Sequence, residues 1–175
     1  MELFVGEPLA LDLVNTLTRD FDALDSPQAW LESQVGRLTP PSAPLSTADV
    51  AALRALRAHM RAAIDAVRQG QCPPDTAVDA LNEAARAAPA YPVLQSDLHQ
   101  DTRRDGDERA RLLAQLADAA ITLLADPNAD RIRGCEGPRC RMLFLPAHPN
   151  RRWCSPQLCG NRARVARYYQ RQRAT

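Results

Sequence analysis

The sequence predicts a mainly α-helical protein with a small cysteine-rich module at its carboxyl-terminal end. Alanine is abundant and aromatic residues make up only 5% of the 175 residues, a composition that favours helices packed closely through small side chains. Four of the five cysteines lie beyond residue 134, in a segment too short to build an adequate hydrophobic core by itself. We therefore expect a helical domain over residues 1–127, containing a short strand element, and a treble-clef-like finger made of a β-hairpin and a helix over residues 131–175.

The first two helices are predicted from apolar spacing and from an N-cap. Between residues 8 and 17, Leu9, Leu13 and Leu17 recur every four residues, which places them on one face of a short helix. Ser26-Pro27 offers an N-cap followed by a proline in the first helical turn. The helix that begins there is expected to carry a single apolar stripe of Trp30, Leu31, Val35 and Leu38.

A proline-rich linker over residues 39–44 must interrupt the helices, because proline lacks the amide donor and fixes its own φ angle. Ser46 and Asp49 then form the pattern of a capping box. The apolar residues that follow at helical spacing are Leu53, Leu56, Met60, Ile64 and Val67. Gly70 supplies a stop signal, so the sequence predicts a long helix between Ser46 and Gly70.

The rest of this domain is predicted as two helices that flank a strand. Residues 75–88 have helical apolar spacing. Residues 91–98 contain a proline and alternating apolar side chains, which is typical of a short strand. Residues 107–124 return to helical spacing, and Asp126-Pro127-Asn128 ends that helix.

Charge is distributed unevenly along the chain. Residues 131–175 carry eleven arginines and one acidic residue, Glu136, whereas residues 1–130 carry eleven arginines and twenty acidic residues. The formal net charge of +1 therefore conceals an acidic body and a strongly basic tail. Such a tail suits a polyanion, but it also suits docking on the acidic body or on a partner protein.

The sequence predicts neither export nor insertion into a membrane. It begins Met1-Glu2-Leu3-Phe4, without the basic start and long apolar run of a signal peptide, and no apolar stretch approaches the roughly 20 residues needed to cross a bilayer. We expect a cytoplasmic protein. In that reducing compartment, clustered cysteines are read as metal ligands and not as disulfides. Cys72 stands apart before two prolines and is expected to be a spare thiol.

The four clustered cysteines form two close pairs. Four residues separate Cys135 from Cys140, four separate Cys154 from Cys159, and thirteen lie between the pairs. Each pair can bend one short loop around a tetrahedral ion, so the spacing predicts one structural Zn²⁺ per chain. Four thiolates close the coordination shell and leave no position for water or substrate, which argues against zinc catalysis. His148 is an alternative ligand in principle, but it lies in a turn between prolines, where we expect it to face solvent.

The segments around the ligands predict a hairpin followed by a helix. Residues 141–145 are expected to form a strand, residues 146–150 a turn and residues 151–153 the returning strand. Ser155-Pro156 is again an N-cap followed by proline, which places Cys159 in the opening turn of a final helix. Four reduced thiols without a metal are the less favoured alternative, since so small a segment would then lack a core.

Both parts of the chain resemble known families. Cys159-Gly160-Asn161-Arg162, following Trp153-Cys154-Ser155, is the hallmark of the CGNR zinc finger of bacterial proteins. The first part resembles the ABATE domain usually found ahead of that finger, through Gly6, Leu11-Asp12-Leu13, Asn15-Thr16, Ser26-Pro27, Trp30-Leu31 and Leu81-Asn82. Leu13 stands where an aromatic residue is common in that family. The resemblance covers nearly the whole chain and implies a stress-related transcription regulator.

The final helix is the predicted nucleic-acid interface. Arg164, Arg167 and Arg171 share one helical face, and guanidinium groups there suit the phosphates or the guanine edges of duplex DNA. The other face is expected to pack on the hairpin through Leu158, Val165 and Tyr169. The remaining predicted contacts are Arg151 and Arg152 on the hairpin, Asn161, which could read adenine, and Arg162. The helical domain would then serve as a sensor or as a dimerisation module.

Three other functions stay open. The finger could bind RNA instead, with Tyr168 or Trp153 stacking on an unpaired base. It could also be a zinc-stabilised interaction module that binds no nucleic acid. An enzyme is the weakest interpretation, because His59, His99 and His148 lie far apart in the sequence and accompany no nucleophile motif.

A small-molecule effector is also an open hypothesis. Asp12, Asn15 and Thr16 could line a ligand pocket. The alternative is structural, with Asn15 or Thr16 capping the first helix and Asp12 paired in the interior with an arginine such as Arg57. A homodimer formed through the helical domain is a further open hypothesis.

Overall fold

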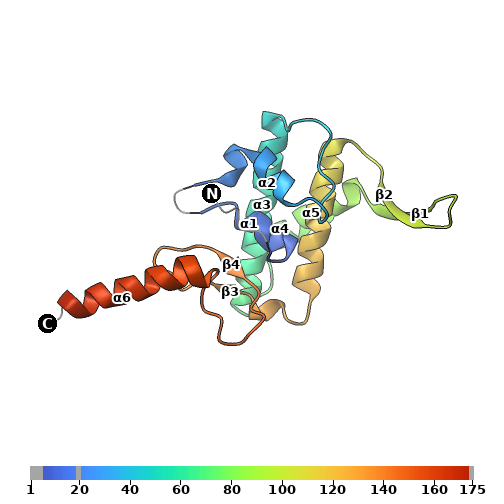
Figure 1. The fold of residues 1–175 in the computed structure, drawn as a ribbon. Coiled ribbons are helices and arrows are strands. Elements are labelled where there is room, and N and C mark those ends of the chain that lie inside the picture. The colour runs from blue at the N-terminus through green and yellow to red at the C-terminus, as the bar shows by residue number, and fades with distance from the viewer. Residues whose placement is uncertain (1–5, 19–20, 174–175) are drawn as a thin grey trace.

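Helices enclose the core of the body, and the finger lies against one end of it in the computed structural model, which describes residues 6–18 and 21–173 (Figure 1). The elements of the body are α1 (Leu9–Val14), η1 (Ala23–Asp25), α2 (Pro27–Ser33), α3 (Thr47–Arg68), α4 (Asp75–Ala87), β1 (Ala90–Leu94), β2 (Gln100–Arg104) and α5 (Glu108–Ala125). Those of the finger and its approach are η2 (Ala129–Arg131), β3 (Arg133–Gly134), β4 (Leu143–Phe144), η3 (Pro156–Gly160) and α6 (Asn161–Arg173). Met1-Glu2-Leu3-Phe4, where no signal peptide is predicted, lies outside the described residues.

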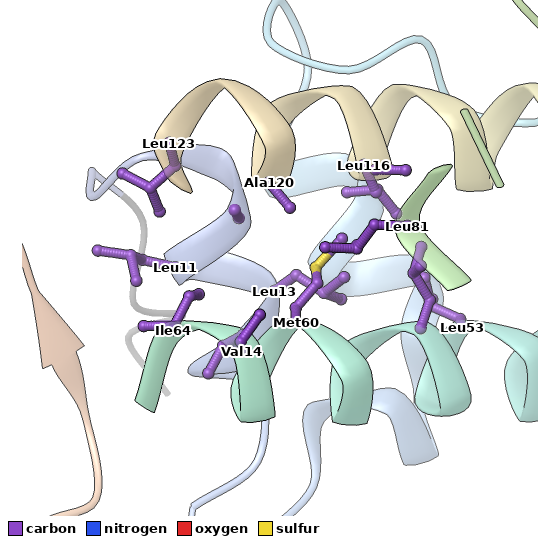
Figure 2. Close-up of a cluster of buried hydrophobic side chains, with 14 of the residues drawn as sticks. Leu11, Leu13, Val14, Leu53, Met60, Ile64, Leu81, Leu116, Ala120 and Leu123 are labelled. Carbon is purple, nitrogen blue, oxygen red and sulfur yellow. The ribbon is translucent and has the colours of Figure 1, made fainter. Parts of the chain in front are cut away.

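The core of the body forms where α1 lies against both α3 and α5 (Figure 2). The six residues of α1 are too few to be a stable helix alone, so packing must hold them. Every residue of α1 after Leu9 is buried, including Asp12. The side chains that meet α1 in this core include Leu53, Met60, Ile64, Leu81, Leu116, Ala120 and Leu123. The predicted mainly helical fold is confirmed.

The predicted capping box begins α3. The Ser46 hydroxyl accepts a hydrogen bond from the Asp49 amide (3.2 Å), and the Asp49 carboxylate accepts one from the Ser46 amide (2.9 Å). The Ser46 side chain and the Arg109 guanidinium lower the pKa of Asp49 to about 2. Because Arg109 belongs to α5, this contact also ties the first turn of α3 to its neighbour. Gly70, with φ of +68°, follows the end of α3 as expected.

The first two helices are shorter than predicted. Helix α1 ends at Val14, so Leu17 is exposed and does not continue the apolar face. Helix α2 ends at Ser33, and the chain turns at Gly36, whose φ of +85° suits glycine. As a result Val35 faces solvent, whereas Leu38 reaches the core from the turn. The prediction of one stripe running from Trp30 to Leu38 was therefore wrong at Val35.

The single strand predicted over residues 91–98 is the first half of a hairpin. Strand β1 pairs antiparallel with β2, and the chain reverses near Leu98, whose φ is +65°. The prediction missed β2 because its residues, Gln-Asp-Thr-Arg-Arg, are polar and almost all exposed. This hairpin extends outward from the helices of the body (Figure 1).

The finger shares the core of the body. Ile132 and Leu143 are buried in the same apolar cluster as the helices, η2 packs on α3, and β4 packs on α1. A second, smaller cluster beneath the cysteines contains Met142 and Phe144. Among the helices that the structure describes, none combines the length and the apolar character needed to span a bilayer.

Candidate functional site

The four predicted ligands come together in one cluster. The sulfur atoms of Cys135, Cys140, Cys154 and Cys159 all lie within 4.8 Å of one another. Tetrahedral zinc with bonds of about 2.3 Å holds its sulfur ligands about 3.8 Å apart. The Cys140 and Cys154 sulfurs are 3.9 Å apart, and those of Cys154 and Cys159 are 3.5 Å apart. The cluster thus fits one structural zinc ion, while Cys72 is exposed and apart from it.

A tight turn between β3 and β4 presents the first pair of cysteines. The Cys135 amide donates to the Met142 carbonyl (2.8 Å), and the Cys140 amide donates to the Gly137 carbonyl (3.0 Å). At Gly137 a Cβ atom would lie 2.9 Å from the Cβ of Cys159, closer than packed atoms approach. Gly137 is therefore needed because a side chain would not fit. Its backbone conformation is not the reason, since the residue with a positive φ in this turn is Arg139.

The second pair lies at the start of the last helical segment, as the sequence predicts. The Ser155 hydroxyl accepts from the Leu158 amide (3.2 Å), and the Ser155 carbonyl accepts from the amides of Cys159 (3.0 Å) and Gly160 (3.1 Å). A Cβ at Gly160 would lie 3.4 Å from the Trp153 ring. The Trp153 ring therefore packs closely over the glycine of the CGNR motif.

Several donors point at the sulfur atoms. The amides of Gly137 (3.4 Å) and Cys154 (3.3 Å) donate to the Cys135 sulfur, and the Arg162 guanidinium donates to the Cys159 sulfur (2.9 Å). Burial raises the pKa of Cys135, and the hydrogen bond from Cys154 lowers the pKa of Cys140 to about 5. Four thiolates and one Zn²⁺ carry a net charge of −2, which such donors help to stabilise. The arginine of the motif thus acts at the metal centre.

The predicted return strand over residues 151–153 was wrong. Strand β4 pairs instead with β3, which precedes the first ligand, so that the turn bearing Cys135 and Cys140 is itself the hairpin loop. Residues 151–153 run beside this loop, where the Arg152 carbonyl accepts from the Glu136 amide (3.0 Å). His148 is exposed in the intervening turn, as expected.

Three of the predicted nucleic-acid contacts already have protein partners, because Arg151 and Arg152 are engaged as well as Arg162. Arg151 donates to Glu7 (2.6 Å) and to the Cys154 carbonyl (2.8 Å), and its guanidinium lies 4.4 Å from the centre of the Phe144 ring. Arg152 forms an exposed ion pair with Glu136. Glu7, which also accepts from the Leu145 amide (3.0 Å), was missed by the sequence analysis. A single sequence offers no signal for a pair 144 residues apart.

The other predicted contacts lie on α6, which leaves the finger and extends away from the body (Figure 1). The side chains of Asn161, Arg164, Arg167 and Arg171 are exposed. The expected packing of the apolar face on the hairpin was wrong, because α6 packs on η3, which precedes it, and then extends away from the body. The exposed fractions of the side chains concerned are 42% for Leu158, 46% for Val165 and 60% for Tyr169.

The residues predicted to line an effector pocket are all buried. Asp12 accepts from the Arg37 guanidinium and from the amides of Gly6 and Glu7 (3.2 Å each), and burial raises its pKa. The expected partner was an arginine such as Arg57, but the structure pairs Asp12 with Arg37, whose guanidinium also donates to the Glu7 carbonyl just before α1.

Thr16 and Asn15 have protein partners of their own. The Thr16 hydroxyl donates to the Leu13 carbonyl (2.6 Å) and accepts from Arg57 (2.7 Å), whose guanidinium forms its ion pair with Asp22 (2.6 Å). The Asn15 side chain binds the backbone of Leu143 in the finger. These polar groups stabilise the fold.

Comparison with known proteins identifies both modules. Residues 7–127 match the ABATE family, described as a putative stress-induced transcription regulator, and residues 131–172 match the CGNR zinc finger. A comparison with curated proteins found no match. Neither matched family is a family of enzymes, and a transcription regulator implies binding to DNA. The chain belongs to the ABATE family, and its ABATE domain is followed by a CGNR zinc finger.

Proposed function

We propose that this protein is a cytoplasmic transcription regulator that binds duplex DNA through the arginine side of α6, with zinc in a structural role. The observation that carries the proposal is the form of α6, a helix that projects from the finger with five arginines and no acidic residue (Figure 1). An α-helix of this kind fits the major groove, which is about 12 Å wide.

The proposed contact surface is the stripe of Arg164, Arg167 and Arg171. At 1.5 Å per residue these positions span about 10 Å along the helix axis. The Arg167 Nε atom donates to the Ala163 carbonyl (3.3 Å), which leaves its two terminal nitrogens available for a phosphate or a guanine. Asn161, exposed at the first position of α6, is the proposed reader of adenine.

The remaining arginines of the finger have a different proposed role. Arg162 donates to a metal ligand, and Arg151 joins Glu7 to the loop of Cys154, so both hold the finger in shape. Arg152 can exchange Glu136 for a DNA phosphate, because an exposed ion pair contributes at most about 1 kcal/mol. We therefore expect DNA contacts from α6, with Arg152 in support.

RNA binding is the second candidate, and it is favoured by one observation. The Tyr168 and Tyr169 rings are 53% and 60% exposed and lie edge to face, with their centres 5.7 Å apart. Exposed aromatic rings suit unpaired bases, where stacking contributes about 1–3 kcal/mol per base. Trp153 is less accessible to a base, because it packs on Gly160 beneath the Arg152 guanidinium.

The test begins by selecting bound sequences from random duplex DNA and single-stranded RNA with the zinc-loaded protein. Mobility shifts then compare the parent with Arg164→Ala/Arg167→Ala. The matched control is Arg86→Ala/Arg109→Ala, which removes two exposed arginines from the body. We expect the α6 variant to lose at least tenfold in DNA affinity while it retains zinc, and its log–log salt dependence to flatten by about two units of slope. The control should bind as the parent does.

Two outcomes reject the DNA proposal. If the parent binds neither nucleic acid at low salt, or if the α6 variant binds as well as the parent, the finger is better described as a protein-interaction module. If single-stranded RNA is preferred and Tyr168→Ala/Tyr169→Ala abolishes that preference, the RNA function takes its place.

A further inference from the structure

A cleft of about 800 Å³ lies on the body, away from the cysteine cluster. Its walls are the linker around Pro40 and Pro41, the base of the β1–β2 hairpin, and α5 (Figure 1). The volume is within the range of about 300–1,000 Å³ that small-molecule sites occupy. None of the residues predicted from the sequence to bind an effector lines this cleft.

The linker wall is held in place by hydrogen bonds to α5. The Thr39 amide donates to the Gln115 side chain (2.9 Å), which donates back to the Thr39 carbonyl (3.2 Å). Ser42 donates to Glu108 through its amide (3.1 Å) and its hydroxyl. Two adjacent prolines further restrict the backbone between these contacts. The cleft is therefore built in advance of any ligand.

The hairpin wall is fixed to α5 as well. Arg104 donates to the Ala88 carbonyl (2.7 Å) and forms an ion pair with Asp118 of α5. On the neighbouring strand the Tyr91 hydroxyl donates to Asp105 (2.8 Å). Arg103 is the direct cross-strand partner of Tyr91 in the β1–β2 register. A phenol ring and a guanidinium thus meet at one side of the cleft.

The charges that line the cleft do not cancel. Its two acidic residues are already engaged, Asp105 by Tyr91 and Glu108 by Ser42, and the hydrogen bonds from Ser42 lower the pKa of Glu108, which keeps it ionised. Of the four arginines, Arg37 is paired with Asp12 and Arg104 with Asp118.

The other two arginines of the cleft, Arg103 and Arg111, have no ion-pair partner among the described residues. Within the described part of the chain, the side chains of Arg103 and Arg111 form neither a hydrogen bond nor an ion pair, and the charge of Arg111 acts on Glu108 only at longer range. They lie on different walls, one on the hairpin and one on α5. Planar guanidinium groups bind carboxylates and phosphates through paired hydrogen bonds. The cleft therefore offers two cationic donors together with the apolar surfaces of Leu9, Tyr91 and the two prolines.

We propose that this cleft binds a small organic anion, with its carboxylate or phosphate group on Arg103 and Arg111 and its apolar portion against Tyr91 and the linker prolines. The ligand would bridge the hairpin and α5. This proposal does not depend on DNA binding by α6, because it rests on contacts within the body alone. It gives the body a specific sensing function that complements the proposed regulator.

The test uses the intact zinc-loaded protein and four probes, namely benzoate, phenyl phosphate, the neutral benzamide, and inorganic phosphate. Binding is followed by NMR, through the Nε–H resonances of the arginine side chains and the amide of Tyr91. We expect benzoate or phenyl phosphate to give saturable shifts at Arg103 and Arg111 with a Kd of about 1 mM or below, a modest affinity for a probe of this size. The preferred headgroup distinguishes carboxylate ligands from phosphate ligands, and benzamide should not bind.

Three variants complete the test. Arg103→Gln/Arg111→Gln should weaken binding at least tenfold, and Ala119→Leu, which fills the cleft from α5 with a good helix former, should do the same with both arginines intact. Arg86→Gln on the exposed side of α4 should bind as the parent does. The proposal is overturned if neither aromatic anion shows saturable shifts, if inorganic phosphate binds as tightly as phenyl phosphate, if benzamide binds equally well, or if both test variants retain parental affinity.

Discussion

Asn15 and Leu143, 128 residues apart, exchange two hydrogen bonds of 2.8 Å each. The Asn15 side-chain amide donates to the Leu143 carbonyl, and the Leu143 amide donates to the Asn15 side-chain oxygen. The side chain of the residue that ends α1 thus pairs with β4 as the backbone of a neighbouring strand would. Because β4 lies between Cys140 and Cys154, this contact joins the body to the metal centre.

Replacing Asn15 should loosen the finger on the body. Asn15→Ala leaves two buried backbone groups of Leu143 without partners, and the expected loss is about 2–4 kcal/mol in the free energy of unfolding. Chemical denaturation measures the loss, and hydrogen exchange should show weaker protection of the Leu143 amide. Asn128→Ala, at an exposed position, should change neither quantity by much. An unchanged protection of Leu143 would contradict the proposed link.

Gly137→Ala should prevent normal zinc binding. The added Cβ would lie 2.9 Å from Cys159 Cβ and 3.2 Å from its sulfur, so the ligand has to move. Gly160→Ala is the matched control, since its Cβ would meet Trp153 at a milder 3.4 Å. Zinc content per chain and competition with a chromophoric chelator measure the difference. Equal zinc affinity in the two variants would show that the loop adjusts at little cost.

Arg162→Gln should weaken the metal centre directly. Removing the hydrogen bond to the Cys159 sulfur is expected to lower zinc affinity about 10- to 100-fold, the range seen for partners of metal ligands. Arg164→Gln removes the same charge two residues further along α6 and should leave zinc affinity unchanged. Chelator competition on both variants provides the measurement, and equal losses would indicate a general charge effect.

Cys159→Ser should release zinc and also destabilise the body. Structural zinc contributes on the order of 10–16 kcal/mol in small fingers, far more than so small a segment gains from burial. Most of the helical circular dichroism should remain, because α3, α4 and α5 form their own core. The melting temperature should fall, since Ile132 and Leu143 belong to that core and come from the finger side. Cys72→Ser should keep one zinc per chain and the parental melting temperature.

The ion pair of Arg57 with Asp22 should make stability depend on pH. The hydrogen bond from Arg57 lowers the pKa of Asp22 below its ordinary value near 3.8. The pair therefore contributes fully above pH 4, and the contribution is lost as the pH falls through the lowered pKa. Asp22→Asn should cost about 2–3 kcal/mol at neutral pH, and this cost should shrink as the pH falls below 4. Asp25→Asn, at an exposed partner of Arg54, should have a small effect at either pH.

Local features of the chain could be predicted well from the sequence. The capping box at Ser46, the helix start at Ser155-Pro156 and the pairing of the cysteines all depend on residues a few positions apart, whose contacts follow from backbone geometry. The zinc cluster follows from two such local loops.

Contacts between distant segments could not be predicted in this way. The pairing of β3 with β4, the partner of Asp12 and the link from Asn15 to Leu143 all depend on how separate elements dock. The arginines of the finger illustrate the difference, because Arg151 and Arg164 look alike in sequence. Only the fold brings Glu7 to Arg151 and leaves Arg164 exposed.

Because Cys159 lies just before α6, the geometry of the metal site determines the direction in which α6 leaves the finger. From Cys159 to Arg171 the helix extends about 18 Å at 1.5 Å per residue, so a tilt of about 10° at Cys159 displaces the far end by about 3 Å. Gly160 against Trp153 and Arg162 against the Cys159 sulfur both restrain the first turn, where a small rotation is amplified most. The orientation of Arg164, Arg167 and Arg171 therefore depends on contacts made by Gly160 and Arg162, close to the Cys159 ligand.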